Sequence, residues 1–331
     1  MTTVPERAER DERHRSGFVS FVGRPNVGKS TLTNALVGEK VAITSPKPQT
    51  TRRAIRGVRT SEGGQLVIVD TPGIHRPRTL LGERLNDLVS GVLVDVDVIG
   101  FCVPADERIG PGDRFIAEQL RDYPRAKKVA IVTKADKAGR GRIAEALLAV
   151  QALGDEVLGG WDEIVPVAAL AGEGARSPRE QAQIDELAAT LIGLLPEGPP
   201  LYGDETVTEE TDEDRIAELI REAALEAAEE ELPHSIAVTI DDIAPRSLSE
   251  RSETKGPDER PMTDVYASLW VERDSQKGIV IGKGGQRLKA IGAAARPGIE
   301  ALVGTRVFLS LHVKVAKDWQ RDPKLLGRLG F

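Results

Sequence analysis

The chain has 331 residues, of which 40% are hydrophobic and 29% charged, a formal net charge of −7 and a single cysteine, Cys102. This composition is typical of a globular protein with room for two domains, and one cysteine excludes an internal disulfide. Segment 1–16 lacks the apolar stretch of a signal peptide, and no apolar run is long enough to span a bilayer. We therefore expect a disordered leader and a cytoplasmic protein.

Charge is distributed unevenly along the chain. Residues 197–231 contain fourteen acidic and two basic residues, whereas residues 277–331 contain eleven basic and three acidic ones. A basic segment of this kind favours contact with a polyanion such as nucleic acid. The distribution of charge alone is equally consistent with a basic surface that faces only solvent.

The first predicted strand, residues 17–22, leads into Gly23-Arg24-Pro25-Asn26-Val27-Gly28-Lys29-Ser30 and then a helix-compatible run that begins at Thr31 and ends before Gly38. The pattern G-x-x-x-x-G-K-[ST] between a strand and a helix is typical of a phosphate-binding loop. Glycines let backbone N–H groups approach phosphate oxygens, and the helix N-terminus adds partial positive charge. We expect Lys29 to reach the β- and γ-phosphates of a nucleoside triphosphate, Ser30 to bind Mg²⁺, and residues 23–31 to contact the nucleotide.

A second part of the metal site is predicted one hairpin later. Residues 44–53 are rich in proline and hydroxyl side chains and are predicted as a loop, followed by strands over 54–60 and 65–69. The second strand runs into Asp70-Thr71-Pro72-Gly73. An aspartate at the end of a buried strand that faces a phosphate loop holds the water shell of Mg²⁺. These four residues are therefore predicted to line the nucleotide site.

The following elements alternate between helix and strand. Helices are predicted over 80–92, 113–121, 142–153 and 181–195, and strands over 97–103, 128–132 and 164–167. This alternation predicts an α/β domain with a mostly parallel sheet and helices on both faces. Ligands of such folds bind at the carboxyl ends of the strands, where all the loops named above fall.

One of these strands ends in Thr133-Lys134-Ala135-Asp136. A carboxylate can accept hydrogen bonds from N1 and N2 of guanine together, whereas adenine has an unprotonated N1. Asp136 therefore favours GTP over ATP, because a buried carboxylate without a donor is costly. A helix-capping aspartate and an ATP-using enzyme are the weaker alternatives.

In order and approximate spacing, these motifs resemble those of the Ras-like translation-factor GTPases. The resemblance implies that Thr51, or its neighbour Thr50, closes on Mg²⁺ and the γ-phosphate, and that Lys29, Thr51 and Gly73 act in catalysis. Thr133 stands where the family usually has asparagine. Ala168-Ala169 replaces a common Ser-Ala, which leaves backbone N–H groups to contact the guanine carbonyl.

A further departure concerns hydrolysis. Ile74 follows Gly73 where Ras-type enzymes carry a glutamine that orients water, and isoleucine cannot form a hydrogen bond with that water. We therefore expect slow intrinsic hydrolysis. Asn26 resembles the residue with which relatives of this kind hold a K⁺ ion beside the phosphates, so the resemblance implies K⁺-assisted catalysis, although Asn26 could simply shape the loop.

The first domain is predicted to cover residues 17–195. Proline, glycine and acidic residues then predict a linker at 196–210, followed by a second domain at 211–331. Its predicted elements are a helix over 211–232, strands over 234–240, 263–272 and 305–315, and helical segments around Gly282-Lys283-Gly284-Gly285, including 296–303. This α-β-β-α-α-β order with a G-x-x-G turn is typical of a type II KH module, which clamps single-stranded nucleic acid. The alternative is a turn with a purely structural role. The residues predicted to contact RNA are Gly282, Lys283, Gly284, Gly285, Arg287 and Lys289.

A GTPase domain followed by this KH module resembles the Era family of bacterial ribosome-assembly GTPases, from Gly17 to about Asp322. The resemblance implies binding near the 3′ end of small-subunit 16S ribosomal RNA and to the 30S precursor, with GTP and GDP controlling the arrangement of the domains. It also implies a monomer with peripheral association at the inner cell membrane. An RNA-binding assembly scaffold, in which the nucleotide is only a structural ligand, is the alternative.

Overall fold

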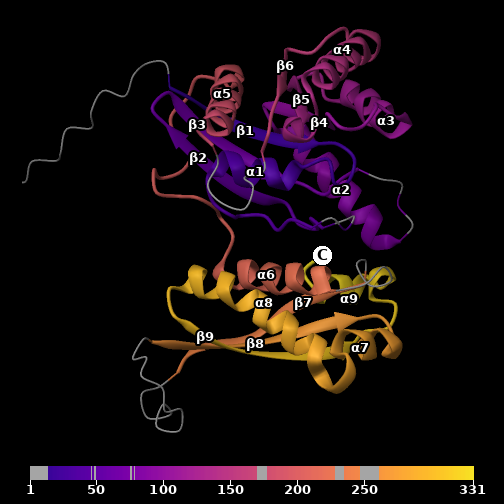
Figure 1. Ribbon diagram of the computed structural model, residues 1–331, viewed down its shortest axis with the longest axis vertical. Coiled ribbons are helices and arrows are strands. Elements are labelled where there is room, and N and C mark those ends of the chain that lie inside the picture. Colours follow the sequence, from indigo (N-terminus) through magenta and orange to yellow (C-terminus); the bar gives the residue numbers. More distant parts are fainter. Residues whose placement is uncertain are drawn as a thin grey trace, which may run out of the picture. The chain divides into compact units, whose positions relative to one another are not determined.

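The computed structural model describes residues 14–45, 47, 50–74, 77, 79–169, 177–227, 235–246 and 261–331. The chain forms two compact units (Figure 1). The first comprises the described residues of Met1–Val41, Ala54–Ile74 and Leu88–Glu209, and the second those of Ala42–Arg53, His75–Asp87 and Glu210–Phe331.

The first unit contains a six-stranded sheet in the order β2-β3-β1-β4-β5-β6. All neighbouring strands are parallel except β2, which pairs with β3 in the predicted antiparallel hairpin. Every residue of β3 and β4 is buried, because helices cover both faces of a parallel sheet. The strands are β1 (Arg15–Val22), β2 (Ile55–Ser61), β3 (Gly64–Asp70), β4 (Val98–Pro104), β5 (Lys127–Thr133) and β6 (Glu163–Pro166).

Two hydrophobic clusters join the helices of this unit to the two faces of its sheet. Helices α1 (Lys29–Val37) and α5 (Pro178–Leu194) pack in one cluster, through side chains such as Leu32 and Leu187. The second half of α2 (Leu80–Asp95), α3 (Pro111–Gln119) and α4 (Arg140–Val157) pack in the other. Short 3₁₀ turns, η1 (Leu120–Asp122) and η2 (Ala135–Lys137), complete the unit. The α/β architecture predicted from the alternation is confirmed.

The predicted end of the first helix is also confirmed, and the single cysteine proves to be a core residue. Gly38 ends α1 in a left-handed conformation (φ 90°), with its N–H donating to the carbonyl of Asn34. Cys102 is fully buried in β4, and burial raises the pKa of its thiol to about 12. A thiol in this environment is protonated at neutral pH and serves as a small core side chain.

Segment 196–209, predicted from its composition as a linker, is hydrogen-bonded to the strands of the first unit. The N–H of Ser16 donates to the carbonyl of Pro196 at 3.1 Å, and that of Val58 to Val207 at 2.8 Å. The side-chain oxygen of Gln65 accepts the N–H groups of Leu201 and Tyr202, each at 2.8 Å. Backbone hydrogen bonds fix this stretch, and composition does not reveal them.

The second unit has the predicted order of elements: α6 (Asp212–Ala227), β7 (Ala237–Pro245), β8 (Met262–Val271), α7 (Asp274–Ile281), η4 (Lys283–Gly285), α8 (Gln286–Val303) and β9 (Arg306–Val315). Strand β7 is antiparallel to β8, and β9 is parallel to β8. Thr211 caps the start of α6, since the N–H of Asp214 donates to the Thr211 hydroxyl at 3.2 Å. The predicted helix end and strand start at 228–234, and the loop at 247–260, lie outside the described residues.

Beyond β9 the chain forms η5 (Trp319–Arg321) and α9 (Pro323–Arg328), which the sequence did not predict. Trp319 is fully buried and stacks on Phe331 with the ring centroids 5.5 Å apart. Leu81 and Leu85, at the start of α2, belong to the same hydrophobic cluster. Segments 42–53 and 75–87, which composition places in the first domain, thus group with the second unit.

Candidate nucleotide-binding site and RNA-binding turn

The predicted phosphate loop connects β1 to α1, and its backbone is left-handed at three positions. Gly23, Asn26 and Gly28 have φ values of 153°, 64° and 105°. Glycine is required at position 23, because an added Cβ would lie 2.6 Å from the carbonyl oxygen of Cys102. Gly28 precedes the first turn of α1 and, as a glycine, offers no side-chain cap. Helix N-termini of this kind commonly bind anions.

Lys29 lies at the centre of this loop with only 7% of its surface exposed. Its ammonium donates to the carbonyls of Gly23 at 3.1 Å and Arg24 at 3.0 Å. Burial lowers the pKa of Lys29 below its ordinary value, although the charge of Asp70 opposes this effect. Gly73 approaches closely, since a Cβ there would lie 3.2 Å from the Lys29 ammonium. A desolvated cation held by two carbonyls is well suited to receive phosphate oxygens.

Ser30 and Asp70 come together as the sequence predicts. The Ser30 hydroxyl donates to Oδ2 of Asp70 at 2.8 Å, and Asp70 is completely buried at the end of β3. Among the described residues, His, Cys, Asp and Glu form no group of three or more that could enclose a metal. Mg²⁺ usually takes one or two protein oxygens together with substrate phosphates and water, so this pair fits Mg²⁺ brought by a nucleotide.

The remaining predicted residues of this half of the site differ in exposure. Thr71 and Pro72 are buried, Thr31 is half-buried on α1, and Ile74 packs partly buried against the core on the α2–α4 face. Thr51, the third predicted magnesium ligand, belongs to segment 42–53 of the second unit and is 8% exposed.

The loop after β5 is tied to the phosphate loop by Thr133. This residue is 1% exposed, and its hydroxyl donates to the carbonyl of Val27 at 2.6 Å. Threonine in place of the expected asparagine therefore still joins the two loops. Lys134 is left-handed (φ 55°), and within the described part of the chain only Asn26 and Asp318 share this feature among non-glycine residues. Unusual backbone of this kind gathers at functional sites, and Asp136 is exposed beside it.

The two alanines predicted to approach guanine are buried after β6. Ala168 and Ala169 are 5% and 7% exposed. The N–H of Ala168 donates to the side-chain oxygen of Gln183, a contact of 3.4 Å that the sequence did not indicate. Gln183 on α5 thus helps to position the backbone at Ala168, the residue that stands where the family often has serine.

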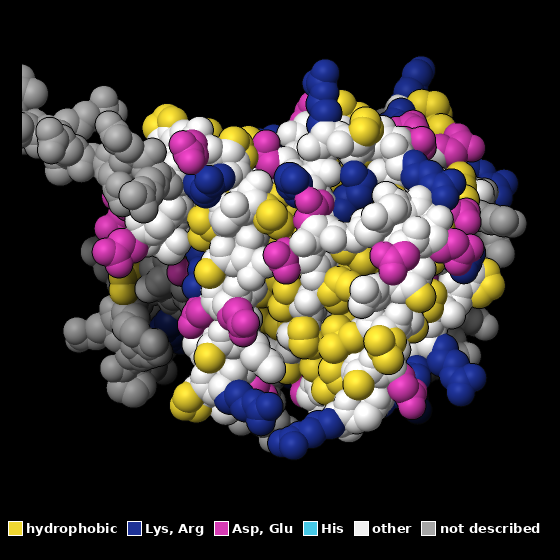
Figure 2. Space-filling view, turned by 90° about the horizontal axis from the view of Figure 1, so that it is seen from above, with side chains coloured by type: hydrophobic (Ala, Val, Ile, Leu, Met, Phe, Trp, Pro, Cys, Tyr) yellow, Lys and Arg dark blue, Asp and Glu magenta, His cyan; other side chains and the backbone are white. Residues whose placement is uncertain are grey.

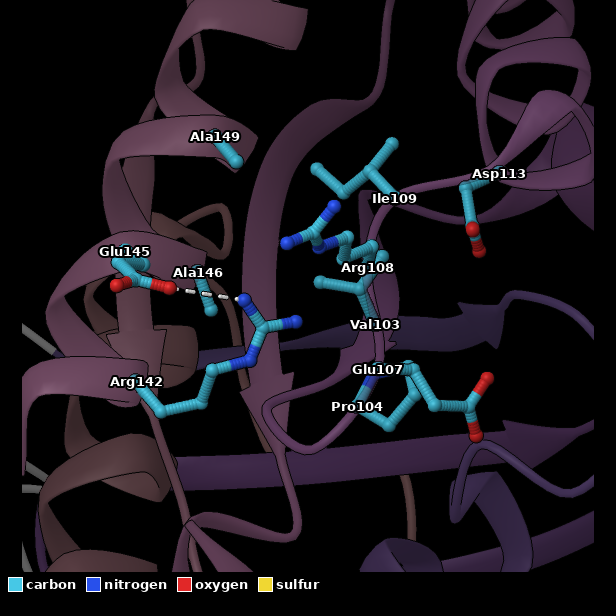
Figure 3. Close-up of a pocket in the computed structure, with 10 residues that line it drawn as sticks. All are labelled: Val103, Pro104, Glu107, Arg108, Ile109, Asp113, Arg142, Glu145, Ala146 and Ala149. Carbon is cyan, nitrogen blue, oxygen red and sulfur yellow. Dashed lines mark hydrogen bonds and ion pairs between the residues drawn. The ribbon is translucent and has the colours of Figure 1, made fainter. Parts of the chain in front are cut away.

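Two acidic residues that the sequence analysis missed lie against the phosphate loop. Arg24 donates from Nε to Asp113 at 2.7 Å and from a terminal nitrogen to Glu107 at 2.9 Å. Both acids also line a cavity of about 340 Å³ between the β4–α3 loop and α4 (Figure 3). Asp113 could have been noticed from the sequence Gly110-Pro111-Gly112-Asp113. A proline that follows a glycine, with an aspartate two positions after the proline, is typical of the start of a helix.

The predicted RNA-binding turn adopts a backbone that only glycine accommodates easily. Gly282, Gly284 and Gly285 have φ values of 73°, 60° and 79°. A Cβ on Gly282 would lie 2.7 Å from that of Arg287, whereas Cβ atoms on the other two glycines would meet nothing within 4 Å. Lys283 and Lys289 are exposed. Arg287 instead donates to the carbonyl of Ile279 at 3.0 Å and so braces the last turn of α7.

On the face that Figure 2 displays, acidic and basic side chains are interspersed, with hydrophobic side chains gathered between them. Among the described helices, none combines the length and apolarity that a membrane crossing demands.

Comparisons with known proteins agree with both halves of the chain. The family described as 50S ribosome-binding GTPase matches residues 18–135, and the KH domain family matches residues 231–320. A protein of Streptomyces coelicolor named GTPase Era is 56% identical over 318 residues, covering 96% of this chain and 95% of its own. GTPase Era of Mycobacterium sp. (strain KMS) is 58% identical over 318 residues, covering 96% and 99%.

Two solved structures resemble the whole chain. One is Era in complex with MgGDPNP and nucleotides 1506–1542 of 16S ribosomal RNA, with a TM-score of 0.83, 36% identity and coverage of 96% of this chain and 99% of that one. The other is a single-residue variant of Aquifex aeolicus Era bound to GDP·AlF4⁻, with a TM-score of 0.84, 35% identity and the same coverage of 96% and 99%. The P-loop GTPase domain, the KH domain and the activity as a GTPase follow from these relationships, and the chain belongs to the Era family of GTPases.

Proposed function

We propose that this protein binds the 3′ end of small-subunit ribosomal RNA during 30S assembly, and that its nucleotide state controls this binding. The observation that carries the proposal is the grouping of segment 42–53, which contains Thr51, with the KH unit. The related Era structure holds both MgGDPNP and a 16S ribosomal RNA fragment, which supports RNA as the partner.

On the nucleotide side, residues 23–31 hold the phosphates, with Lys29 on the β- and γ-phosphates. Ser30, Asp70 and Thr51 serve the magnesium, and Gly73 lies against the γ-phosphate. Thr133, Lys134 and Asp136 receive the guanine together with the backbone of Ala168 and Ala169. The short contacts from Lys29 to its loop and from Ser30 to Asp70 support these assignments.

On the RNA side, the glycine turn allows a nucleic-acid backbone to approach closely, because Gly284 and Gly285 leave open space where side chains would stand. Lys283 and Lys289, both exposed, supply phosphate contacts. Arg287 keeps the turn in shape through its hydrogen bond to Ile279, and we propose that it also contacts RNA, as the turn it braces does.

Segment 42–53 is anchored in the second unit by backbone and side-chain contacts. The N–H of Thr44 donates to Glu222 at 3.0 Å, and Arg221 donates to the carbonyl of Thr50. Arg52, only 3% exposed, donates to the carbonyl of Ile236 at 2.7 Å. A change in this segment when GTP binds would therefore be felt by α6 and by the strand that begins after Ile236.

The Arg52 guanidinium is central to this anchorage. It lies 5.8 Å from the ring centroid of Trp319 and 6.0 Å from that of Phe331, within the range of cation–π attraction. Burial, helped by the neighbouring Arg221 charge, lowers the pKa of Arg52 to about 9. It remains a cation at neutral pH, since protonation is lost only as the pH rises toward that value.

We expect Arg52→Met to uncouple RNA binding from the nucleotide. Methionine fills much of the same space beside the two stacked aromatic rings but cannot donate to Ile236. In the unaltered protein, RNA affinity with GDP and with a non-hydrolysable GTP analogue should differ by about 5–150-fold, the usual range of coupling between sites. In the variant this ratio should fall to about 2-fold or less, as measured by fluorescence anisotropy with a labelled RNA of the 16S 3′-end sequence.

The matched control is Arg56→Ala, which removes an exposed ion pair to Glu209 in the first unit. It should leave the ratio unchanged, because exposed pairs contribute little. An unaltered protein with the same RNA affinity in both nucleotide states would refute nucleotide control itself. An Arg52→Met protein with the full ratio would refute only the role of this anchor.

Potassium is proposed as an assisting cation. Asn26 is exposed in the phosphate loop, and Ile74 offers no hydrogen bond to water, so a cation beside the phosphates would supply the missing charge stabilisation. We expect turnover in KCl to exceed that in NaCl by roughly 10-fold at equal ionic strength. Asn26→Ala should abolish the difference, and equal rates in the two salts would contradict the proposal.

The alternative function is an assembly scaffold in which the nucleotide only stabilises the fold. Cells whose sole copy is Lys29→Ala would distinguish the two, since normal ribosome assembly without GTP turnover favours the scaffold. We further propose a cytoplasmic monomer with peripheral association at the inner membrane. Sedimentation of the purified protein, with and without vesicles of anionic and of zwitterionic lipid, tests both points.

A further inference from the structure

The side chain of Arg24, although it belongs to the phosphate loop, is directed to the start of α3. Its Nε donates to Oδ1 of Asp113 at 2.7 Å, and the Asp113 side chain is 1% exposed. Oδ2 of the same carboxylate accepts the N–H of Gly110 at 2.9 Å. A single buried carboxylate thus fixes the phosphate loop and the first turn of α3 at once.

The local sequence Gly110-Pro111-Gly112-Asp113 builds this receptor. Gly110 is extended (φ −113°), Pro111 begins the helix, and Asp113 at the third helical position folds back to Gly110. Gly112 makes room for the arginine, because a Cβ there would lie 3.0 Å from Cδ of Arg24. A larger side chain at position 112 would therefore press against Arg24.

Glu107 extends the contact to the loop that reads the base. It accepts from Arg24 at 2.9 Å and lies 3.8 Å from the ammonium of Lys134. Figure 3 shows Glu107 and Asp113 on the same side of the cavity, opposite the residues of α4. Burial alone would lower the pKa of Arg24, but the hydrogen bonds and charges of Asp113 and Glu107 together raise it above its ordinary value.

The backbone of Arg24 also contacts the predicted catalytic lysine, Lys29. The carbonyls that accept from the Lys29 ammonium belong to Gly23 and to Arg24 itself. If the Arg24 side chain lost its partner, the backbone at this position would be free to turn, and the direction of the Lys29 ammonium would be less well defined. The Arg24–Asp113 pair therefore acts on the site through the backbone of the loop.

We infer that Asp113 is a positioning residue for the GTPase reaction, which holds the phosphate loop in its binding-competent shape through Arg24. The phosphates of a bound nucleotide impose the same shape on the loop. When the loop is loosened, a smaller fraction of the free protein has the binding-competent loop, and the apparent affinity for nucleotide falls. The rate at which bound GTP reacts is largely preserved.

The test compares Asp113→Asn, Arg24→Met and the double variant in the full-length protein, without RNA. We expect each single variant to raise the Kd for a fluorescent GDP and for a non-hydrolysable GTP analogue by about 10-fold, with the single-turnover rate of saturating GTP changed less than about 3-fold. The double variant should be no weaker than the singles, because both remove the same pair.

Asp106→Asn is the matched control, since Asp106 is exposed in the same β4–α3 loop. It should bind nucleotide as the unaltered protein does. A purely structural role of Asp113 would lower the melting temperature but leave the Kd of the folded protein unchanged, and that outcome overturns the inference. A fall in the single-turnover rate with unchanged Kd, or additive effects in the double variant, would overturn it as well. Because no RNA is present, the outcome is independent of the proposed control of RNA binding.

Discussion

Lys29→Ala is expected to slow GTP hydrolysis by roughly 10²–10³-fold, the cost of removing one preorganised donor from a transition state that develops negative charge. The size of the effect follows from the position of Lys29. The residue is 7% exposed, and its ammonium donates to two carbonyls of its own loop. A cation in such a site acts at lower dielectric and without reorganisation when the reaction occurs. Alanine leaves both the phosphates and the two carbonyls without their donor.

The measurement is single-turnover release of phosphate at saturating GTP and Mg²⁺, with nucleotide affinity determined separately. Lys127→Ala is the control: Lys127 stands at the opposite, amino end of β5 and forms an exposed pair with Asp162 at 3.0 Å. It should hydrolyse GTP at the unaltered rate. A Lys29→Ala protein that retains more than about a third of the activity, an increase of less than about 0.7 kcal/mol in activation free energy, would contradict the assignment of Lys29.

The double substitution Gly284→Asp, Gly285→Asp is expected to weaken RNA binding by roughly 100-fold, equivalent to about 2.7 kcal/mol. Both glycines are left-handed and have open space where a Cβ would stand, so the backbone strain is only about 1–2 kcal/mol each. The substitutions place two carboxylates where the RNA backbone would approach. Like charges at close range, added to lost backbone contact, account for the effect.

Affinity is measured by anisotropy with an RNA of the 16S 3′-end sequence over a range of KCl concentrations. The control is Gly304→Asp at the end of α8, where φ is 70° and a Cβ would also meet nothing within 4 Å. It introduces one strained aspartate of the same kind away from the turn and should bind RNA within about 2-fold of the unaltered protein, since charges beyond the Debye length are screened. Equal losses in both proteins would show that the turn has no special role. GTP hydrolysis without RNA should be unchanged in both.

Much of the fold could be predicted because the relevant signals are local. The pattern from Gly23 to Ser30 contains both the glycines that the left-handed loop requires and the lysine that returns to it. Asp70 could be paired with Ser30 because the carboxyl ends of parallel strands meet at one edge of the sheet. The glycine turn at 282–285 was visible because positive φ angles strongly favour one residue type.

Other residues could not be found in this way, because their partners are distant along the chain. Thr133 reads as a departure from the family pattern until its hydroxyl is seen to donate to Val27. Arg24 reads as one more loop residue until Asp113, 89 positions away, is found against it. Segment 196–209 has the composition of a linker, yet backbone hydrogen bonds fix it to β1, β2 and neighbouring residues.

The sequence by itself thus determined the phosphate loop and the glycine turn, because each depends on backbone angles and spacings encoded over a few residues. The pairing of Ser30 with Asp70 followed from the order of the elements, since that order decides which loops meet at one edge of the sheet. Only the tertiary structure decided that segment 42–53 and the start of α2 group with the KH unit, and that Arg52 is buried there beside Trp319 and Phe331. The physical reason is that burial of a side chain depends on surfaces contributed by remote parts of the chain. A short stretch of sequence specifies its own conformation, but not the surfaces that come to cover it.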